Sequence, residues 1–364
     1  MDLDYSADQQ ALRATVRRLL ADRAPIARLR ELAGRAAPLD GAWRGLTELG
    51  VPALMAPEAQ GGLDLGLVDM GTALEEAGRA LYYGPLISSA VSGVLTVRLL
   101  GSETDHTDLL PSIADGTVVA TLAHLEPGAR YDWRAPQARA DASRLTGTKC
   151  WVPDASVADL LLVVAQAEDG IAVFAVESDA DGVSVTETPT YDVSRSFATV
   201  TLAGAQARRV GSGDAAAALV QVVDRTMLAY VVDGLGAAER ALEMTLDYAQ
   251  TREQFGRPIG SFQAVQHLCA DMLQLLEMGR AGAHYALWAA DSSDEAAAHL
   301  ASTMACAWAA DAFYQLGATA IQVFGGVGFT WEHDIGLYFK RLLTVAQVYG
   351  DTREHLEELA SLII

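Results

Sequence analysis

The part of the sequence that does most to decide the fold is the stretch Tyr248-Ala-Gln-Thr-Arg-Glu-Gln-Phe-Gly-Arg-Pro-Ile-Gly-Ser-Phe-Gln263. It interrupts a helical pattern of apolar residues that begins near residue 214 and continues to the end of the chain. Two glycines and a proline within the stretch are typical of a loop between helices. A second glycine-rich break, Gln322-Val-Phe-Gly-Gly-Val-Gly328, follows further along. The two segments therefore predict loops at the ends of long helices.

Outward from these segments, the periodicity of the chain changes twice. Residues 1–115 have apolar residues at helical spacing and begin with the capping-box pattern Ser6-Ala-Asp-Gln9. Residues 116–210 hold short apolar or alternating runs, which predict strands at 117–123, 160–165, 171–176, 183–187 and 197–202. Residues 211–364 return to the helical period. The predicted fold class is therefore α+β, with an N-terminal all-α domain, a middle β-barrel or sandwich and a C-terminal helical domain over these three ranges.

The segment from Ala296 to Phe324 is apolar on nearly all of its faces. A helix of a soluble protein has that pattern when it is buried on several sides. We interpret it as a helix within a subunit interface. The alternative is an internal helix of a monomeric bundle.

The composition excludes several classes of function. Apolar residues make up 51% of the 364 residues and charged residues 20%, which is typical of a folded globular protein rather than a disordered one. The formal net charge of −21 opposes binding to nucleic acid, because Lys and Arg provide the attraction to phosphates. The chain has no apolar run long enough for a membrane span and no signal-like N-terminus, so we expect a cytoplasmic protein. Its three cysteines predict neither a disulfide framework nor a metal site.

The two loop segments resemble the two signatures of the acyl-CoA dehydrogenase family. In that family a helix ends in T-R-x-x-F-G, a loop leads to a glutamine, and a later segment has the pattern Q-x-x-G-G-x-G. Residues 248–263 and 322–328 match these patterns in the right order. The resemblance spans essentially the whole chain. It implies the family architecture of an all-α domain, a β-barrel and a C-terminal four-helix bundle.

The resemblance also implies a cofactor and a reaction. Family members use FAD to oxidise an acyl-CoA to a 2,3-enoyl-CoA, and they usually pass the electrons to an electron-transfer flavoprotein. The two loops reach the adenosine and pyrophosphate part of the FAD of a neighbouring subunit, which implies a homo- or hetero-oligomer such as a tetramer. A guanidinium fork and closely approaching backbone N–H groups suit a pyrophosphate. The cofactor-binding residues implied are Arg252, Phe255, Gln263, Gln322, Gly325 and Gly326.

Two motifs of the middle domain depart from the family pattern. The family sequence T-E-P-G-A-G-S-D has a Thr and a Ser that contact flavin and thioester, whereas this chain reads Leu125-Glu-Pro-Gly-Ala-Arg-Tyr-Asp132. The family strand Lys-x-Trp-[Ile/Val]-[Thr/Ser] lies against the flavin ring, and here it reads Lys149-Cys-Trp-Val-Pro153. Pro153 also removes a backbone donor. Trp151 is therefore either a flavin contact or an ordinary packing residue of the barrel.

The catalytic base of the family is absent from both of its usual positions. The reaction needs a carboxylate in a dry pocket over the flavin. In many members it is the Glu of Tyr-Glu-Gly-Thr near the C-terminus, and here Gly350 takes that place. Other members have the base on the first long helix of the C-terminal domain, where this chain has Thr226.

Two aspartates remain as candidate bases, and a third is a candidate contact with CoA. Asp351 follows the usual base position by one residue and is one methylene shorter than Glu, and a displacement of an ångström can cost about a hundredfold in rate. Asp233 either faces the pocket or turns to solvent, and we favour solvent. Asp224 matches a family Asp that contacts CoA, or else it caps or solvates the start of its helix.

Three interpretations of function remain open. The loops that bind a neighbour's FAD are intact, whereas the groups that orient the chain's own flavin and remove a proton are not. This asymmetry favours the base-lacking subunit of a heteromeric acyl-CoA dehydrogenase, similar to actinobacterial-type α2β2 enzymes that act on bulky acyl-CoAs such as steroid side chains. One alternative is a self-sufficient homotetramer with Asp351 or Asp233 as base. Another is a flavin- or thioester-binding protein of different activity, or a structural subunit.

Two histidines are interpreted as structural. His267 has no second ligand at the spacing that a metal site needs. His355 is surrounded by glutamates in the sequence, which is typical of an exposed helix face.

Overall fold

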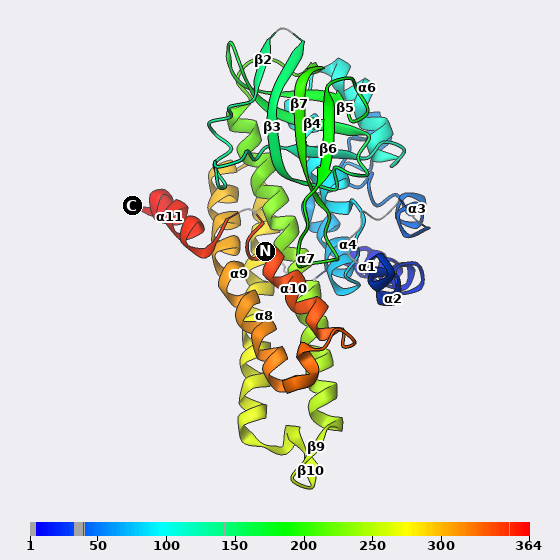
Figure 1. Ribbon diagram of the computed structural model, residues 1–364, viewed down its shortest axis with the longest axis vertical. Helices are drawn as coiled ribbons and strands as arrows, with labels where there is room; N and C mark the ends of the chain where they lie inside the picture. The colour runs from blue at the N-terminus through cyan, green and yellow to red at the C-terminus, as the bar shows by residue number, and fades with distance from the viewer. Residues whose placement is uncertain (1–4, 33–38, 40, 142, 349) are drawn as a thin grey trace. The chain divides into compact units, whose positions relative to one another are not determined.

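A computed structural model describes residues 5–32, 39, 41–141, 143–348 and 350–364 of the chain (Figure 1). By their internal contacts the described residues form two compact units. One unit comprises Ala27–Met70 and Tyr83–Thr226 and contains a β-sheet. The other comprises Met1–Ile26, Gly71–Tyr82 and Met227–Ile364 and is mainly helical. The predicted order of helices, strands and helices along the chain is confirmed.

The helices begin and end close to the predicted punctuation. The capping box at the start of the first helix is confirmed, because the Ser6 hydroxyl accepts from the Gln9 N–H and the Gln9 side chain accepts from the Ser6 N–H. The α-helices are α1 (Ala7–Arg23), α2 (Ile26–Leu32), α3 (Gly41–Glu48), α4 (Leu67–Arg79), α5 (Val94–Leu100), α6 (Glu103–Ala114), α7 (Ala216–Thr251), α8 (Gln263–Ala290), α9 (Glu295–Phe324), α10 (Ile335–Val345) and α11 (Thr352–Ile363).

Among the described residues, eight strands form one sheet. They are β1 (Ala120–Ala123), β2 (Arg139–Asp141), β3 (Arg144–Pro153), β4 (Leu160–Ala167), β5 (Gly170–Glu177), β6 (Val183–Glu187), β7 (Phe197–Gln206) and β8 (Arg208–Val210). Their order in the sheet is β6-β7-β3-β2-β4-β5-β8, and β1 pairs in parallel with β4. All five strands predicted from the apolar pattern are present, and β3 contains the strand at 149–153 that the family resemblance implies. Strands β2 and β8 are additional.

The apolar pattern alone does not predict β3, because polar residues and a glycine break its alternation. Lys149, in the middle of this strand, is fully buried and forms a 2.6 Å ion pair with Glu126. A lysine is almost never buried unless it is paired. Only the folded chain therefore shows why a lysine belongs in the core of this sheet.

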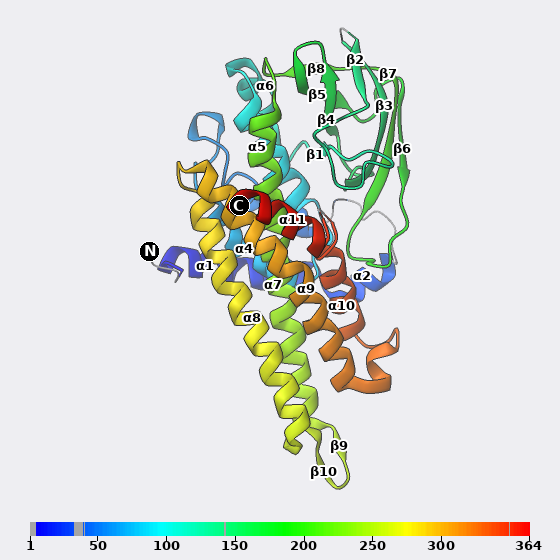
Figure 2. The same ribbon diagram turned by 90° about the vertical axis from the view of Figure 1, so that its left-hand side faces the viewer.

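In the helical unit, α8 and α9 run side by side, and α10 and α11 also pack on α9 (Figure 2). The predicted helix at 296–324 is confirmed by α9. Its small side chains are buried by neighbouring helices of the same chain. Met304 and Tyr314 of the same helix are about half exposed, at 49% and 51%. Packing within the chain therefore explains part of the apolar pattern, and a subunit interface at α9 stays a prediction. None of the helices in the described ranges combines the length and hydropathy that a membrane span requires.

Two glycines let the backbones of α4 and α7 touch within the helical unit. A Cβ atom on Gly78 would overlap the carbonyl group of Asp233, and one on Gly236 would overlap that of Glu75. Close-packed contacts of this kind leave no room for a larger residue at either position. Arg13 of α1 forms a 2.8 Å ion pair with the buried Glu75 of α4. This ion pair connects α1 to the contact between α4 and α7.

Candidate functional site

The first glycine-rich segment forms a short hairpin between α7 and α8. Strand β9 (Glu253–Gln254) pairs antiparallel with β10 (Arg257–Pro258). Phe255 and Gly256 make the turn with φ values of +56° and +76°, a region that favours glycine. The Phe255 side chain is 93% exposed. The predicted loop between helices is therefore confirmed, and its tip presents an aromatic ring to solvent.

The second glycine-rich segment continues from α9 as a 3-10 turn, η4 (Gly325–Phe329). A Cβ atom on Gly325 or Gly326 would meet nothing within 4 Å, so the backbone here is open to an approaching group. The Phe324 ring, just before the turn, stacks on Tyr248 of α7 with 4.3 Å between ring centroids. This stack places the two glycine-rich segments next to each other at one end of the helices.

The two segments together present a cation and open backbone. The Arg252 side chain is exposed, and within the described ranges it makes no ion pair. Gln263 and Gln322 are exposed as well. Arg257, on the same hairpin, instead lies over the Phe262 ring at 4.1 Å. The six cofactor candidates of these loops thus share two adjoining exposed segments, and Arg252 has a guanidinium available for an anion.

Trp151 belongs to the sheet unit. It lies at an irregularity of β3 between Lys149 and Val152 and has a φ of +53°. Its side chain is 48% exposed and meets the Phe197 ring edge-on at 6.0 Å. Core packing therefore does not account for the tryptophan, because about half of its indole lies outside the core.

The usual position of the base is held by a buried glycine with a φ of +141°, Gly350. The next residue, Asp351, is the N-cap of α11. Its carboxylate accepts from the Glu354 N–H at 3.1 Å, and the Glu354 carboxylate accepts from the Asp351 N–H at 3.0 Å. At the second family position, the Thr226 hydroxyl donates to the carbonyl of Val222 one turn earlier in α7. The Asp351 carboxylate and the Thr226 hydroxyl thus both bond to backbone groups of their own helices.

Asp233 is buried, so the solvent orientation favoured from the sequence is wrong. It is 1% exposed and pairs with the fully buried Arg341 of α10, with N–O distances of 3.0 and 3.2 Å. Arg341 also donates to the carbonyl of Tyr82 at 2.7 Å. A buried carboxylate is stable when it is paired and hydrogen-bonded. The Asp233 carboxylate is therefore part of a buried ion pair in the helical unit.

Asp224 is 6% exposed and lies well inside α7, which begins at Ala216. Capping residues lie at the helix terminus and solvating ones on an exposed face. The alternative of capping or solvating the helix start is therefore wrong. A contact with CoA stays a prediction for this residue.

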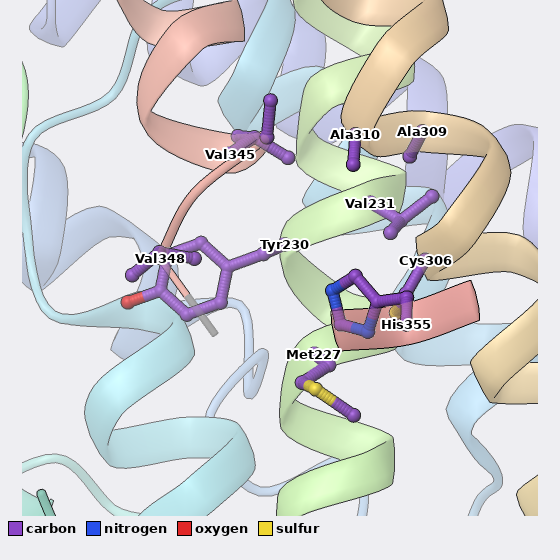
Figure 3. A pocket seen from close by; sticks show the side chains of 10 residues that line it. Met227, Tyr230, Val231, Cys306, Ala309, Ala310, Val345, Val348 and His355 are labelled. Atoms are coloured by element: carbon purple, nitrogen blue, oxygen red, sulfur yellow. The ribbon is translucent and has the colours of Figure 1, made fainter. Parts of the chain in front are cut away.

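His355 does not lie on an open helix face, in contrast to the expectation from the sequence. Its ring lines a small cavity together with Met227, Tyr230 and Val231 of α7 and Cys306 of α9 (Figure 3). The cavity volume is about 10 Å³, roughly the minimum for one water molecule. Burial lowers the pKa of His355 below its usual range, although the nearby Glu354, Asp351 and Glu358 act in the opposite direction. The imidazole is therefore neutral at pH 7.

Comparison with known proteins gives the family. Three protein-family models match the chain: the acyl-CoA dehydrogenase N-terminal domain over residues 6–117, the middle domain over 121–203 and the C-terminal domain over 217–362. The chain belongs to the acyl-CoA dehydrogenase family. This is a family of oxidoreductases, and the resemblance drawn from the two loop segments is confirmed.

Individual relatives agree with this assignment. The acyl-CoA dehydrogenase IpdE2 of Mycobacterium tuberculosis is 31% identical over 356 residues, which cover 97% of this chain and 96% of the relative. Among solved structures, a variant of the Tcur3481–Tcur3483 steroid ACAD has a TM-score of 0.90 at 33% identity and covers 98% of this chain and 97% of its own. The ChsE4–ChsE5 complex from Mycobacterium tuberculosis has a TM-score of 0.89 at 30% identity, with coverage of 99% and 98%.

Proposed function

We propose that this chain is the base-lacking subunit of a heteromeric, FAD-dependent acyl-CoA dehydrogenase. The observation that carries the proposal is the usual position of the base, where Gly350 offers no side chain and the imidazole of His355 lies beside it. The reaction of the assembly is the α,β-dehydrogenation of an acyl-CoA thioester to a 2,3-enoyl-CoA.

Family membership and the two exposed loops support FAD as the cofactor. The available guanidinium of Arg252 and the open backbone at Gly325 and Gly326 fit a pyrophosphate, which is bound by cationic forks and closely approaching N–H groups. When bound, FAD supplies the acceptor for the hydride that leaves the β-carbon of the substrate. In this proposal the two loops hold the adenosine and pyrophosphate part of the FAD of a neighbouring subunit.

The aspartates considered as substitutes for the base are engaged in other contacts. Asp351 caps α11, and Asp233 is paired with Arg341. Abstraction of an α-proton needs a carboxylate that is free to reach the α-carbon. A carboxylate held by an arginine or by the backbone at a helix start would first have to give up those contacts. The base that removes the proton therefore comes from the partner chain.

A second acyl-CoA dehydrogenase chain is the partner that this proposal requires. The two similar solved structures carry paired names, Tcur3481–Tcur3483 and ChsE4–ChsE5, and the second is called a complex. Because the first is named a steroid ACAD, we propose a bulky acyl-CoA such as a steroid side-chain thioester as substrate. An electron-transfer flavoprotein is the proposed electron acceptor, on the basis of the family.

The flavin-to-chain ratio tests the proposal. The protein purified alone is expected to hold little FAD and to form no enoyl-CoA. After co-expression with the acyl-CoA dehydrogenase chain encoded beside it, about one FAD per pair and enoyl-CoA formation are expected. Asp351→Asn should leave the activity of the pair unchanged, and it should fold normally because Asn caps helices as well as Asp. About one FAD per chain and turnover by the protein alone would sink the proposal, and loss of that turnover in Asp351→Asn would identify the base.

Arg252→Ala is expected to weaken FAD binding by the pair about 10- to 100-fold, because a hydrogen bond to a charged group contributes about 1.5–3 kcal/mol. Titration of the apoprotein with FAD, followed by flavin fluorescence, measures the change. Arg257→Ala is the matched control, since it removes the same charge from the same hairpin but from a guanidinium that lies on the Phe262 ring. Equal losses in both variants would mean that Arg252 makes no specific contact.

A further inference from the structure

The ring of His355 fills the space beside the position where the base of this family is attached. A Cβ atom on Gly350 would lie 2.9 Å from both Cε1 and Nε2 of the imidazole. A separation this short leaves no room for a side chain at residue 350 unless the ring moves, since protein interiors are close-packed. The φ of +141° at Gly350 adds backbone strain for any other residue. The imidazole ring of His355 therefore occupies the space that a side chain at residue 350 would need.

The cavity next to this ring is small. Its walls include Met227, Tyr230 and Val231 of α7 and Cys306 of α9, and the His355 ring faces into it (Figure 3). A volume of about 10 Å³ admits about one water molecule and no acyl group. The cavity lies beside the residue that the resemblance puts at the usual position of the base, because the His355 ring that lines it is also the nearest side chain to Gly350.

The start of α11 holds the ring in place. Asp351 and Glu354 form a reciprocal capping box in the first turn, which contains His355. A neutral ring among apolar side chains needs no counter-charge. These contacts suit a side chain that fills space.

We propose that His355 is a plug: its imidazole closes the acyl site of this chain and so confines acyl-CoA binding to the site completed by the partner. The inference rests on the proposed function. In this proposal His355 sets how many acyl-CoA molecules the assembled pair binds, although it lies outside the reacting site.

Calorimetric titration of the assembled pair with butyryl-CoA tests the plug, because a four-carbon acyl group is small enough for the space that an imidazole leaves. His355→Ala is expected to bind about one more butyryl-CoA per copy of this chain than the unmodified pair does. His355→Phe keeps the ring volume without the nitrogen atoms and is expected to bind no more than the unmodified pair. His299→Ala is the control for loosening of α11, because the His299 ring of α9 lies 3.4 Å from the carboxylate of Glu358 on α11. This variant should bind no additional butyryl-CoA.

The outcomes separate this inference from the proposed function. If the pair is active with about one FAD but His355→Ala takes up no additional butyryl-CoA, the plug is wrong and the proposed function stands. If His355→Phe and His355→Ala both abolish turnover of the pair, the nitrogen atoms take part in the reaction and the plug is overturned. A self-sufficient isolated chain would instead refute the proposed function, whatever the stoichiometry of these variants.

Discussion

Replacing Arg341 with methionine is expected to lower the free energy of unfolding of the helical unit by about 3–5 kcal/mol, because the variant leaves a buried carboxylate without a counter-charge. Arg341 and Asp233 are 0% and 1% exposed and lie 3.0 Å apart. The substitution also removes the hydrogen bond to the Tyr82 carbonyl. Methionine keeps most of the side-chain length, so little of the loss reflects an empty cavity. Denaturant unfolding of the purified protein measures the change.

Two further variants isolate the buried charge as the cause. Arg353→Met removes an exposed partner of Glu357 in α11, and exposed pairs of this kind contribute little, so no measurable change is expected. The double variant Asp233→Asn with Arg341→Met should be more stable than Arg341→Met alone, since it leaves no unpaired buried charge. If the double variant is as unstable as the single one, packing rather than charge explains the loss.

Several features of the fold could be predicted because they depend on local sequence. The capping box at Ser6 and the alternating runs of the central strands are signals within a few residues. The two loop segments were also indicated locally, by Gly256 and Gly325, which have positive φ values in the structure. By contrast, the apolar pattern did not indicate β3, which only the family resemblance implied, because the burial of Lys149 depends on Glu126, 23 residues away. Local patterns predict elements well and tertiary compensation poorly.

The features of the candidate site also differ in whether a local sequence pattern could indicate them. The pattern Asp351-x-x-Glu354 is itself a capping-box signal, so the capping role of Asp351 could have been read from the sequence. The pairing of Asp233 with Arg341 could not, since 108 residues separate them and the contact forms only in the folded unit. The position of His355 likewise depends on which face α11 turns inward. Sequence alone therefore indicated which base is missing, but not what occupies its place.

Glu126→Gln is expected to destabilise the sheet unit by about 3–5 kcal/mol, because it leaves the fully buried ammonium of Lys149 without its counter-charge. Glu126 accepts from Lys149 at 2.6 Å and from the backbone N–H groups of Gln137 and Ala138 at 2.7 and 2.9 Å. Glutamine keeps only one oxygen acceptor, so the variant loses one of the backbone hydrogen bonds together with the charge. Glu177→Gln, an exposed position at the end of β5, is the matched control and should leave the unfolding transition unchanged.

The effect of Glu126→Gln on the free energy of unfolding should depend on pH. Burial alone would raise the pKa of Glu126, but Lys149 and the two backbone N–H groups outweigh it and lower the pKa below its usual range. A carboxylate with a lowered pKa in the folded state stabilises the fold above its ordinary pKa of about 4.3, and that contribution is lost as the pH falls from there through the folded-state pKa. The difference in unfolding free energy between the unmodified protein and Glu126→Gln should therefore be largest near neutral pH and shrink on acidification. A difference that grows toward low pH would mean that the carboxylate is not the stabilising partner of Lys149.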